Sequence, residues 1–455
     1  MITGWQDHLT SVLQQKDREE FAQAIVELYN QFDNIQDFIE HTSAYLVSTQ
    51  LRNDYQRFQP GSFLGFVAAV QMGRYVQPFF QFRALAQSLW CSAWEGLGEP
   101  VKIENPLQVE LPEDSDQYYK KLDELFISQD FESFFAWVTS GISDSGKRDS
   151  TIYWLLQNSG QDFNSQGYKF LYISKSLELM EYLSWKNVAT YLHPCLHYMM
   201  FAPQGFEHRE MINERIDFHK LDLNSENKVF EISKDEAYQL RNAILHEKPE
   251  SILDNFLGAF EYGVDTEVIS EILLLTASQL VLAIPYENWL FPVHGFNLTE
   301  GINSRLNYLS QAEKKRLLLM NALALKQVVD AAQPFRFQEP FFTPRPNEAE
   351  ASIHELEEAI DLSIAYDAMA SFESLYKQNK LTQRIFGRLA LESIKTDGHI
   401  HSGHDLRFAY SAIETFHSSF SPHRMYYVLA LVKFLAESEK GRDLDHAVLR
   451  RMRNY

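Results

Sequence analysis

Cysteines and long hydrophobic runs are scarce in this sequence. Only two of the 455 residues are cysteines, Cys91 and Cys195, which is too few for a disulfide framework and leaves no CxxC pair for a thiolate metal cluster. The most apolar stretch runs from Val268 to Ile284, but Glu271 interrupts it and it falls short of the roughly 20 apolar residues that span a bilayer. The N-terminus has neither the basic region nor the apolar run of a signal or transit peptide. We therefore expect a cytoplasmic protein with no membrane contact, in which residues 268–284 form a buried core helix.

The sequence also lacks phosphate-binding motifs, serine-hydrolase motifs and an excess of basic residues. There is no Gly-x-Gly-x-x-Gly segment, no Walker loop and no Gly-x-Ser-x-Gly elbow, so nucleotide binding and serine hydrolysis have no support. The 41 Lys and Arg residues oppose 62 Asp and Glu residues, and the formal charge of −21 repels nucleic acid and anionic lipid. The sequence leaves a homo-oligomer open.

Helix signals are frequent and strand signals are rare. Asp17-Arg18-Glu19-Glu20 and Ser310-Gln311-Ala312-Glu313 have the spacing of a capping box ahead of apolar residues on one helix face. Ser421-Pro422 places an N-cap residue before a proline at the first helical position. No hairpin dipeptide of the Asn-Gly type joins two alternating segments. The sequence predicts an all-α fold, either a large multi-helix bundle or stacked helix pairs, with little or no sheet.

Further helices and three breaks organise the chain. Helices are expected near residues 62–94, 117–138, 167–184, 187–201, 234–246, 250–261, 298–309, 351–377, 381–396 and 404–418. Proline-rich breaks are expected at Gly96–Asp116 and Pro334–Asn347, and a polar loop at Pro203–Leu223. We predict an N-terminal helical lobe over residues 1–100 and a main helical domain over residues 101–455, or one continuous unit.

His294 is a candidate catalytic residue. It follows the aromatic segment Trp289–Val293 and precedes a helix with several polar residues, among them Thr299 and Asn303. Because Thr299 and Asn303 are four residues apart, they face the same way on a helix and are predicted to bind substrate. The alternative for His294 is a hydrogen-bonded histidine of the core.

A second polar group lies near His404. It includes His399 and His401, and it continues along one helix to Glu414-Thr415-Phe416-His417, which has the Glu-x-x-His spacing of di-iron bundles. We predict His404, Glu414 and His417 as metal ligands, with iron or another redox metal as the candidate cofactor. The alternative is that Glu414 and His417 are neighbours on a solvated helix face.

Three segments together resemble a known family. They are Gly167–Tyr172 with the later Leu183-Ser184-Trp185, then Val293–Thr299, and finally His404-Asp405-Leu406-Arg407-Phe408 with Glu414. The combination resembles an uncharacterised all-helical bacterial family that is distantly similar to questin oxidase-like proteins. The chain departs from the family pattern where Tyr168 and Asn187 stand in place of histidines. His193 and His197, which flank a Pro194 suited to a first helical position, are candidates to replace them in space.

The resemblance implies an oxidase-like oxidoreductase that acts on a small organic molecule in an internal helical pocket. It carries over to four residues: His294 and His404 as general bases or metal ligands, Arg407 as the partner of an oxyanion or carboxylate, and Thr299 as a substrate contact. The alternative function is a non-catalytic helical binding or assembly protein.

Overall fold

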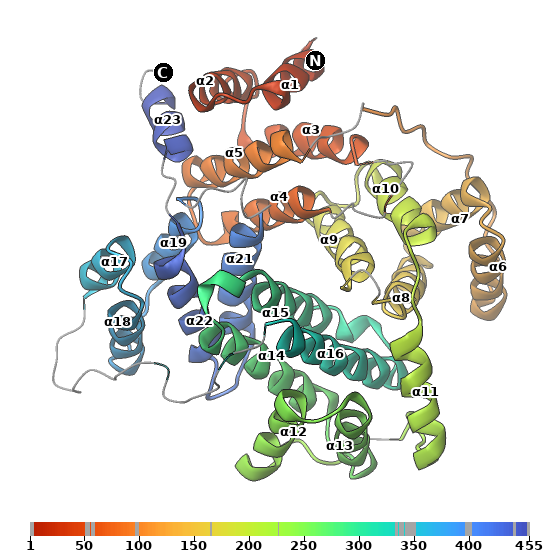
Figure 1. Cartoon of the computed structure of the whole chain (residues 1–455). Coiled ribbons are helices and arrows are strands. Elements are labelled where there is room, and N and C mark those ends of the chain that lie inside the picture. Colours follow the sequence, from red (N-terminus) through yellow and green to blue (C-terminus); the bar gives the residue numbers. More distant parts are fainter. Residues whose placement is uncertain are drawn as a thin grey trace.

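The computed structural model describes residues 4–50, 55, 60–95, 100–163, 166–225, 227–332, 335, 341, 352–395, 403–439 and 443–452. Helices account for 74% of the chain, and the described residues contain 22 α-helices and no strand. One isolated bridge joins Val229 to Val264. The predicted all-α fold is therefore confirmed for the described part of the chain, and Figure 1 shows the helices arranged around a central group.

The helices follow one another along the whole chain, with three short 3-10 helices between them. Their bounds are α1 Trp5–Gln14, α2 Arg18–Tyr29, α3 Ile35–Ser48, α4 Gly61–Gln71, η1 Met72–Arg74, α5 Pro78–Trp94, α6 Ser115–Ile127, α7 Phe131–Ser143, α8 Arg148–Ser159, α9 Tyr168–Tyr182, α10 Val188–Phe201, α11 Glu207–His219, α12 Lys234–His246, α13 Pro249–Glu261, α14 Thr266–Ala283, η2 Tyr286–Asn288, α15 Leu290–Asn303, η3 Leu306–Tyr308, α16 Gln311–Ala331, α17 Ile353–Asp361, α18 Ala365–Lys377, α19 Gln383–Glu392, α21 His404–Ser418, α22 Met425–Glu437 and α23 Asp443–Met452.

Two of the three helix starts predicted from capping residues are present. The third was wrong, because α22 begins at Met425 with Arg424 as its N-cap and not at Ser421-Pro422. The side chain of Asp17 accepts hydrogen bonds from the backbone N–H groups of Glu19 and Glu20 ahead of α2. Ser310 accepts one from Glu313 ahead of α16. Each cap satisfies backbone donors that a helix start leaves without a partner inside the helix.

Some predicted bounds were wrong. The helix expected over 62–94 is interrupted at η1, and the one expected over 351–377 is interrupted between α17 and α18. The polar loop expected at Pro203–Leu223 contains α11, and Pro194 lies inside α10 rather than at its start. Most of Pro334–Asn347 lies outside the described residues, as do His399 and His401.

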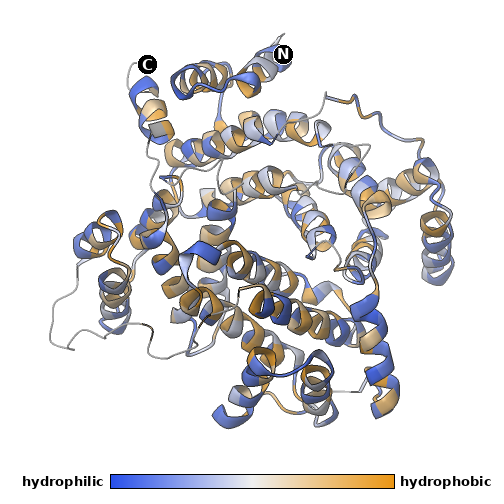
Figure 2. Ribbon diagram, in the orientation of Figure 1, coloured by the Kyte–Doolittle hydropathy of each residue, from blue (hydrophilic) through white to orange (hydrophobic). Residues whose placement is uncertain are grey.

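The central helix α14 packs against α15, α16 and α22. Within the described residues it is the one helix long and apolar enough to cross a membrane, but 72% of it is buried inside the protein, which is typical of a core helix. Figure 2 shows α14 mostly in the hydrophobic colour, whereas the outer helix α11 carries much of the hydrophilic colour. The hydrophobic side of the fold thus faces the middle of the molecule.

Four helices form a closed frame: α4 packs on α9, α9 on α15, α15 on α21, and α21 on α4. We call α4, α9, α15 and α21 the four-helix frame. The contact between α4 and α21 is close, since a Cβ atom on Gly65 would lie 3.0 Å from the Cα atom of Gly403. Because α4 belongs to the first 100 residues, that part of the chain shares its core with the rest, while the predicted division at residue 100 stays a prediction.

Candidate active site inside the four-helix frame

Buried charged and polar side chains gather inside the four-helix frame. They come from three of its helices: Lys175 and Glu178 from α9, His294, Asn297 and Glu300 from α15, and His404, Arg407 and Ser411 from α21. Ionisable groups are rarely buried unless they are paired or have a function. Their concentration in one place marks this interior as the candidate site.

One end of the interior holds Tyr168, His294, His404 and Arg407, which we call the histidine centre. The Tyr168 hydroxyl lies 3.3 Å from Nε2 of His404. The Tyr168 ring is tilted against the His294 ring at 4.6 Å between centroids, and the two imidazoles are 6.1 Å apart. Trp289 closes one side with its ring 5.9 Å from that of His404.

Helix starts position these side chains. Tyr168 is the first residue of α9 and His404 is the first residue of α21, and each follows a glycine with positive φ, Gly167 at 77° and Gly403 at 74°. His294 lies in the second turn of α15. Helix N-termini carry partial positive charge. Because α9 and α21 both begin at the histidine centre, this charge favours an anion there and disfavours an imidazolium.

His294 is held in one tautomer. Its Nε2 donates to the backbone carbonyl of Gln166 at 2.7 Å, which leaves the lone pair on Nδ1. Nδ1 is buried and has no hydrogen-bond partner among the described residues. Burial and the positive charge of Arg407 lower the pKa of His294 to about 4, so the imidazole is neutral at pH 7 and its Nδ1 can accept a proton.

Arg407 is buried beside the Tyr168 hydroxyl, and among the described residues its two terminal nitrogens, Nη1 and Nη2, lack a well-aligned hydrogen-bond partner. Burial lowers the pKa of Arg407, while the neighbouring Tyr168 and Glu300 act in the opposite direction. A buried guanidinium with free donors is costly, and the anion that would satisfy it is a carboxylate, an oxyanion or a phosphate.

Asn297 supplies a third group of unused polar atoms. Both its amide nitrogen and its amide oxygen are buried without a hydrogen bond to any residue that the structure describes. Asn297 lies three residues after His294 on α15, so the two side chains are neighbours on one helix face. His294, Arg407 and Asn297 together offer an acceptor, charged donors and an amide to a polar molecule.

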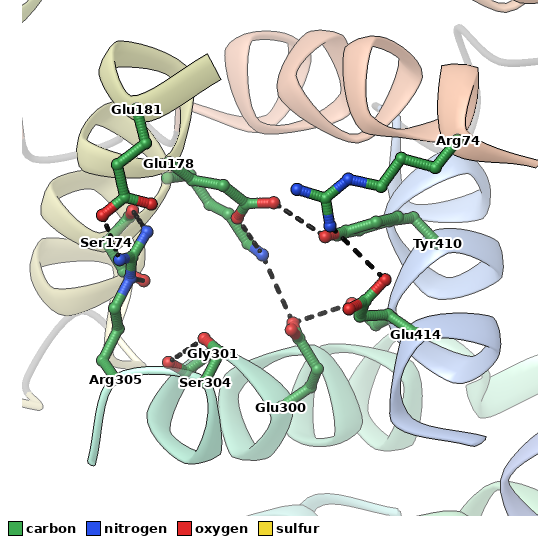
Figure 3. A network of polar contacts seen from close by, with 12 residues as sticks. Arg74, Ser174, Glu178, Glu181, Glu300, Gly301, Ser304, Arg305, Tyr410 and Glu414 are labelled. Carbon is green, nitrogen blue, oxygen red and sulfur yellow. Dashed lines mark hydrogen bonds and ion pairs between the residues drawn. The ribbon is translucent and has the colours of Figure 1, made fainter. Parts of the chain in front are cut away.

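A network of ion pairs and hydrogen bonds fills the other end of the interior, and Figure 3 shows it enclosed by the four-helix frame. Lys175 binds Glu178 at 2.7 Å and Glu300 at 3.4 Å. Tyr410 donates to Glu178 at 2.8 Å and Ser411 donates to Glu300 at 3.0 Å. We call these five residues the ion network.

Burial and mutual attraction shift the pKa values of the ionisable groups in the ion network. Burial opposes the charged forms of Lys175 and Glu178, but their mutual attraction prevails, so the pKa of Lys175 is raised and that of Glu178 is lowered. Burial raises the pKa of Glu300, and the charge of Glu178 adds to this effect against the attraction of Lys175. Glu300 is therefore the member that most readily takes up a proton.

The network leads toward the surface on the side of η1. Arg74 lies 3.6 Å from Glu414, whose carboxylate also accepts a hydrogen bond from Tyr75 at 2.6 Å. Arg74 is 54% exposed and points toward Tyr410 and Glu414 in Figure 3. Arg74 interacts electrostatically with Tyr410 and Glu178, so this exposed residue lies on the solvent side of the buried network.

The structure brings three of the predicted site residues together: His294 from α15, and His404 and Arg407 from α21. Their catalytic roles stay predictions. Thr299 lies 2.8 Å from the carbonyl oxygen of Gly295 and 3.1 Å from the amide oxygen of Asn321 on α16. Thr299 thus makes its hydrogen bonds within α15 and to α16, and not to the residues of the histidine centre.

Asn303 also points elsewhere, because its amide oxygen accepts a hydrogen bond from Ser270 on α14 at 2.7 Å. The proposed pairing of Thr299 and Asn303 as substrate contacts is therefore not supported by their partners.

The predicted metal set does not come together. His404 and Glu414 are ten residues apart on one helix, which separates them by roughly 15 Å at the rise of an α-helix. His417 stacks on Tyr75 at 5.5 Å, near the surface. The described residues contain no group of three His, Cys, Asp or Glu side chains able to hold a metal ion, so they do not fit an iron centre.

His193 and His197 do not replace the histidines that the family pattern would place elsewhere. They lie on α10 against Phe131 of α7, at 4.9 and 5.0 Å between ring centroids. His197 also pairs with the Tyr55 hydroxyl at 2.7 Å. These contacts belong to packing between α7 and α10.

Sequence reasoning missed the ion network. Lys175 and Glu178 lie on α9, whose residues from Tyr168 to Met180 are all buried, and the signal was a pair of opposite charges three residues apart in a mostly apolar segment.

Compared with known proteins, the chain matches no family model, no curated protein and no solved structure.

Proposed function

We propose that this chain is an oxidoreductase that binds a small hydroxylated aromatic molecule in the histidine centre. The observation that carries the proposal is the unused hydrogen-bonding capacity there: Nδ1 of His294 and both terminal nitrogens of Arg407 are buried without a partner among the described residues. Buried polar groups normally find partners, and exceptions concentrate at functional sites.

The proposed chemistry begins with a proton transfer. Nδ1 of His294 takes the proton of a substrate O–H group, and Arg407 holds the oxyanion that remains. Burial is the larger cause of the lowered pKa of His294 and the charge of Arg407 is the second. The oxyanion formed beside Arg407 offsets this second cause, so it stabilises the His294 imidazolium once the proton has moved. Tyr168 and His404, 3.3 Å apart, are positioned to pass a second proton.

The oxidative step rests on the resemblance to questin oxidase-like proteins. For a hydroquinone, two electrons and two protons leave the substrate and reduce molecular oxygen to hydrogen peroxide, which yields the quinone. The residues described do not fit a metal ion, so no step is assigned to one. Aromatic side chains such as Trp289 and Tyr168 border the centre and suit a planar molecule.

Binding can be tested with 4-nitrophenol, which turns yellow when it ionises. Wild-type protein is expected to bind it and to favour the yellow phenolate at a pH at which free 4-nitrophenol is mostly protonated. Arg407→Met should abolish this shift and His294→Gln should reduce it. Arg215→Gln, on α11 outside the four-helix frame, is the matched control and should leave the shift unchanged.

Turnover is tested by oxygen uptake and peroxide formation with a substituted hydroquinone. Uptake that depends on His294 and Arg407 supports the oxidoreductase proposal. If 4-nitrophenol binds but no hydroquinone is oxidised, the alternative of a non-catalytic binding protein takes its place. If the wild-type protein neither binds nor shifts 4-nitrophenol, the histidine centre is not the site.

A further inference from the structure

A separate pocket lies at the surface between α8, α11 and α16, outside the four-helix frame. Its volume is about 230 Å³. At roughly 30 Å³ for a group the size of a water molecule, this volume holds about eight heavy atoms. Figure 1 shows the three helices on the side of the molecule where α11 runs along its edge.

The lining of this pocket is divided into an apolar floor and a basic rim. Leu156 from α8, Ile212 from α11, and Leu317 and Met320 from α16 form apolar walls, and all four are buried. Arg209 and Arg316 contribute charge at the rim. Such a combination suits a ligand with an apolar body and one charged end.

The two arginines are incompletely satisfied. In the described part of the chain, Arg209 makes no hydrogen bond or ion pair. Arg316 donates from Nη1 to the amide oxygen of Asn213 at 2.7 Å, but its Nε is buried without a hydrogen bond. The nearest carboxylate oxygen, from Glu313, lies 3.8 Å from that Nε.

The local charge is opposite to that of the whole protein. The rim has two arginines and one carboxylate, whereas the chain as a whole has a formal charge of −21. An anion that approaches the protein is repelled by most of the surface and attracted at this rim. The charge therefore selects an anionic end for the ligand, and the guanidinium fork selects a carboxylate or a similar planar oxyanion.

We propose that the pocket between α8, α11 and α16 is a binding site for a small carboxylate with an apolar tail of about five carbons. The tail lies against Leu317 and Met320, and the carboxylate binds Arg209 and Arg316. This site is independent of the histidine centre and of the reaction proposed for it.

The test uses hexanoate, which has eight heavy atoms, and its uncharged analogue hexanamide. With methionine methyl groups labelled with carbon-13, NMR is expected to show that hexanoate shifts the Met320 signal, assigned by Met320→Leu, and leaves that of Met369 on α18 unchanged. Hexanamide should bind at least tenfold more weakly, because it lacks the charge that the arginines recognise.

Variants of the rim complete the test. Arg209→Gln should weaken hexanoate binding about tenfold, whereas Arg215→Gln, on the same helix but outside the lining, should bind like wild type. Equal affinity for hexanoate and hexanamide would overturn the proposal, and so would a Met320 signal that does not move. Because the first comparison uses wild-type protein alone, it does not depend on the folding of any variant.

Discussion

Replacement of Lys175 by methionine should destabilise the protein strongly, because it leaves two buried carboxyl groups without their cation. Lys175 is 6% exposed and lies 2.7 Å from Glu178 and 3.4 Å from Glu300. Loss of one partner of a buried ion pair typically costs 3–5 kcal/mol, so we expect about 4 kcal/mol here. With an unfolding entropy of about 2.1 cal/mol/K per residue, 455 residues give roughly 1 kcal/mol/K, and the melting temperature should fall by about 4 °C.

A matched control separates burial from the mere loss of an ion pair. Lys102 lies 3.0 Å from Glu104, a distance similar to that in the buried pair, but the two side chains are 87% and 77% exposed. Lys102→Met should change stability by less than about 0.5 kcal/mol. Both variants are compared with wild type by differential scanning calorimetry at pH 7.

The difference in stability between wild type and Lys175→Met should depend on pH. In wild type the pKa of Glu178 is lowered by Lys175, so this stabilisation is present above the unfolded value of about 4.3 and is lost as the pH falls through the lowered folded value. In Lys175→Met the carboxyl group of Glu178 is buried without its ion-pair partner, and the resulting penalty disappears as the pH falls below about 4.3. The difference between the two proteins should therefore shrink on acidification. A melting temperature at pH 7 equal to that of wild type would refute the reasoning.

Three further predictions concern the site and its frame. The pKa of His294 is about 4 when folded and about 6.5 when unfolded, so its contribution to stability is complete above pH 6.5 and is lost as the pH falls toward 4. In urea unfolding, His294→Gln should therefore lose roughly 2 kcal/mol less than wild type from pH 7 to pH 5, while His193, whose pKa is also lowered to about 4, still loses its own contribution in both proteins. Arg407→Met should raise the melting temperature, since it removes a buried cation with unused donors. Arg83→Met should lower the melting temperature, since Arg83 binds Asp445 through two hydrogen bonds of 2.6 Å. Thermal unfolding of both variants checks that the two changes have opposite signs. Gly65→Ala should destabilise by about 1–3 kcal/mol, because its Cβ would lie 3.0 Å from the Cα atom of Gly403, the N-cap residue of α21. Gly258→Ala on α13, with nothing within 4 Å, should stabilise by up to about 1 kcal/mol. A loss of stability at both positions would contradict the argument from close approach.

Much of the fold could be predicted from the sequence, because helix periodicity and capping are local. Asp17 and Ser310 cap the helices that they were expected to cap, since the hydrogen bonds join residues three or fewer positions apart. The errors in helix bounds arose where local signals conflict with packing. Pro194 suits a first helical position, yet α10 begins at Val188 and continues through it, because the residues on both sides are held by contacts with other helices.

The arrangement of the candidate site could not be predicted from the sequence in the same way. The residue types of His294 and His404 mark them as candidates from the sequence alone, and the family resemblance adds Arg407. Only the packing of α15 against α21 brings these residues together, and it leaves Thr299 hydrogen-bonded to Asn321 of α16. The same packing buries the ion network. Burial and the position of Lys175 then determine the pKa values of Glu178 and Glu300, and therefore which of these carboxyl groups is charged. The sequence by itself therefore determined the helices and the polar groups that they carry, because helix formation depends on hydrogen bonds and periodicity along the chain. Tertiary structure alone decided which of those polar groups meet in the buried interior, because such meetings depend on contacts between segments far apart in the chain.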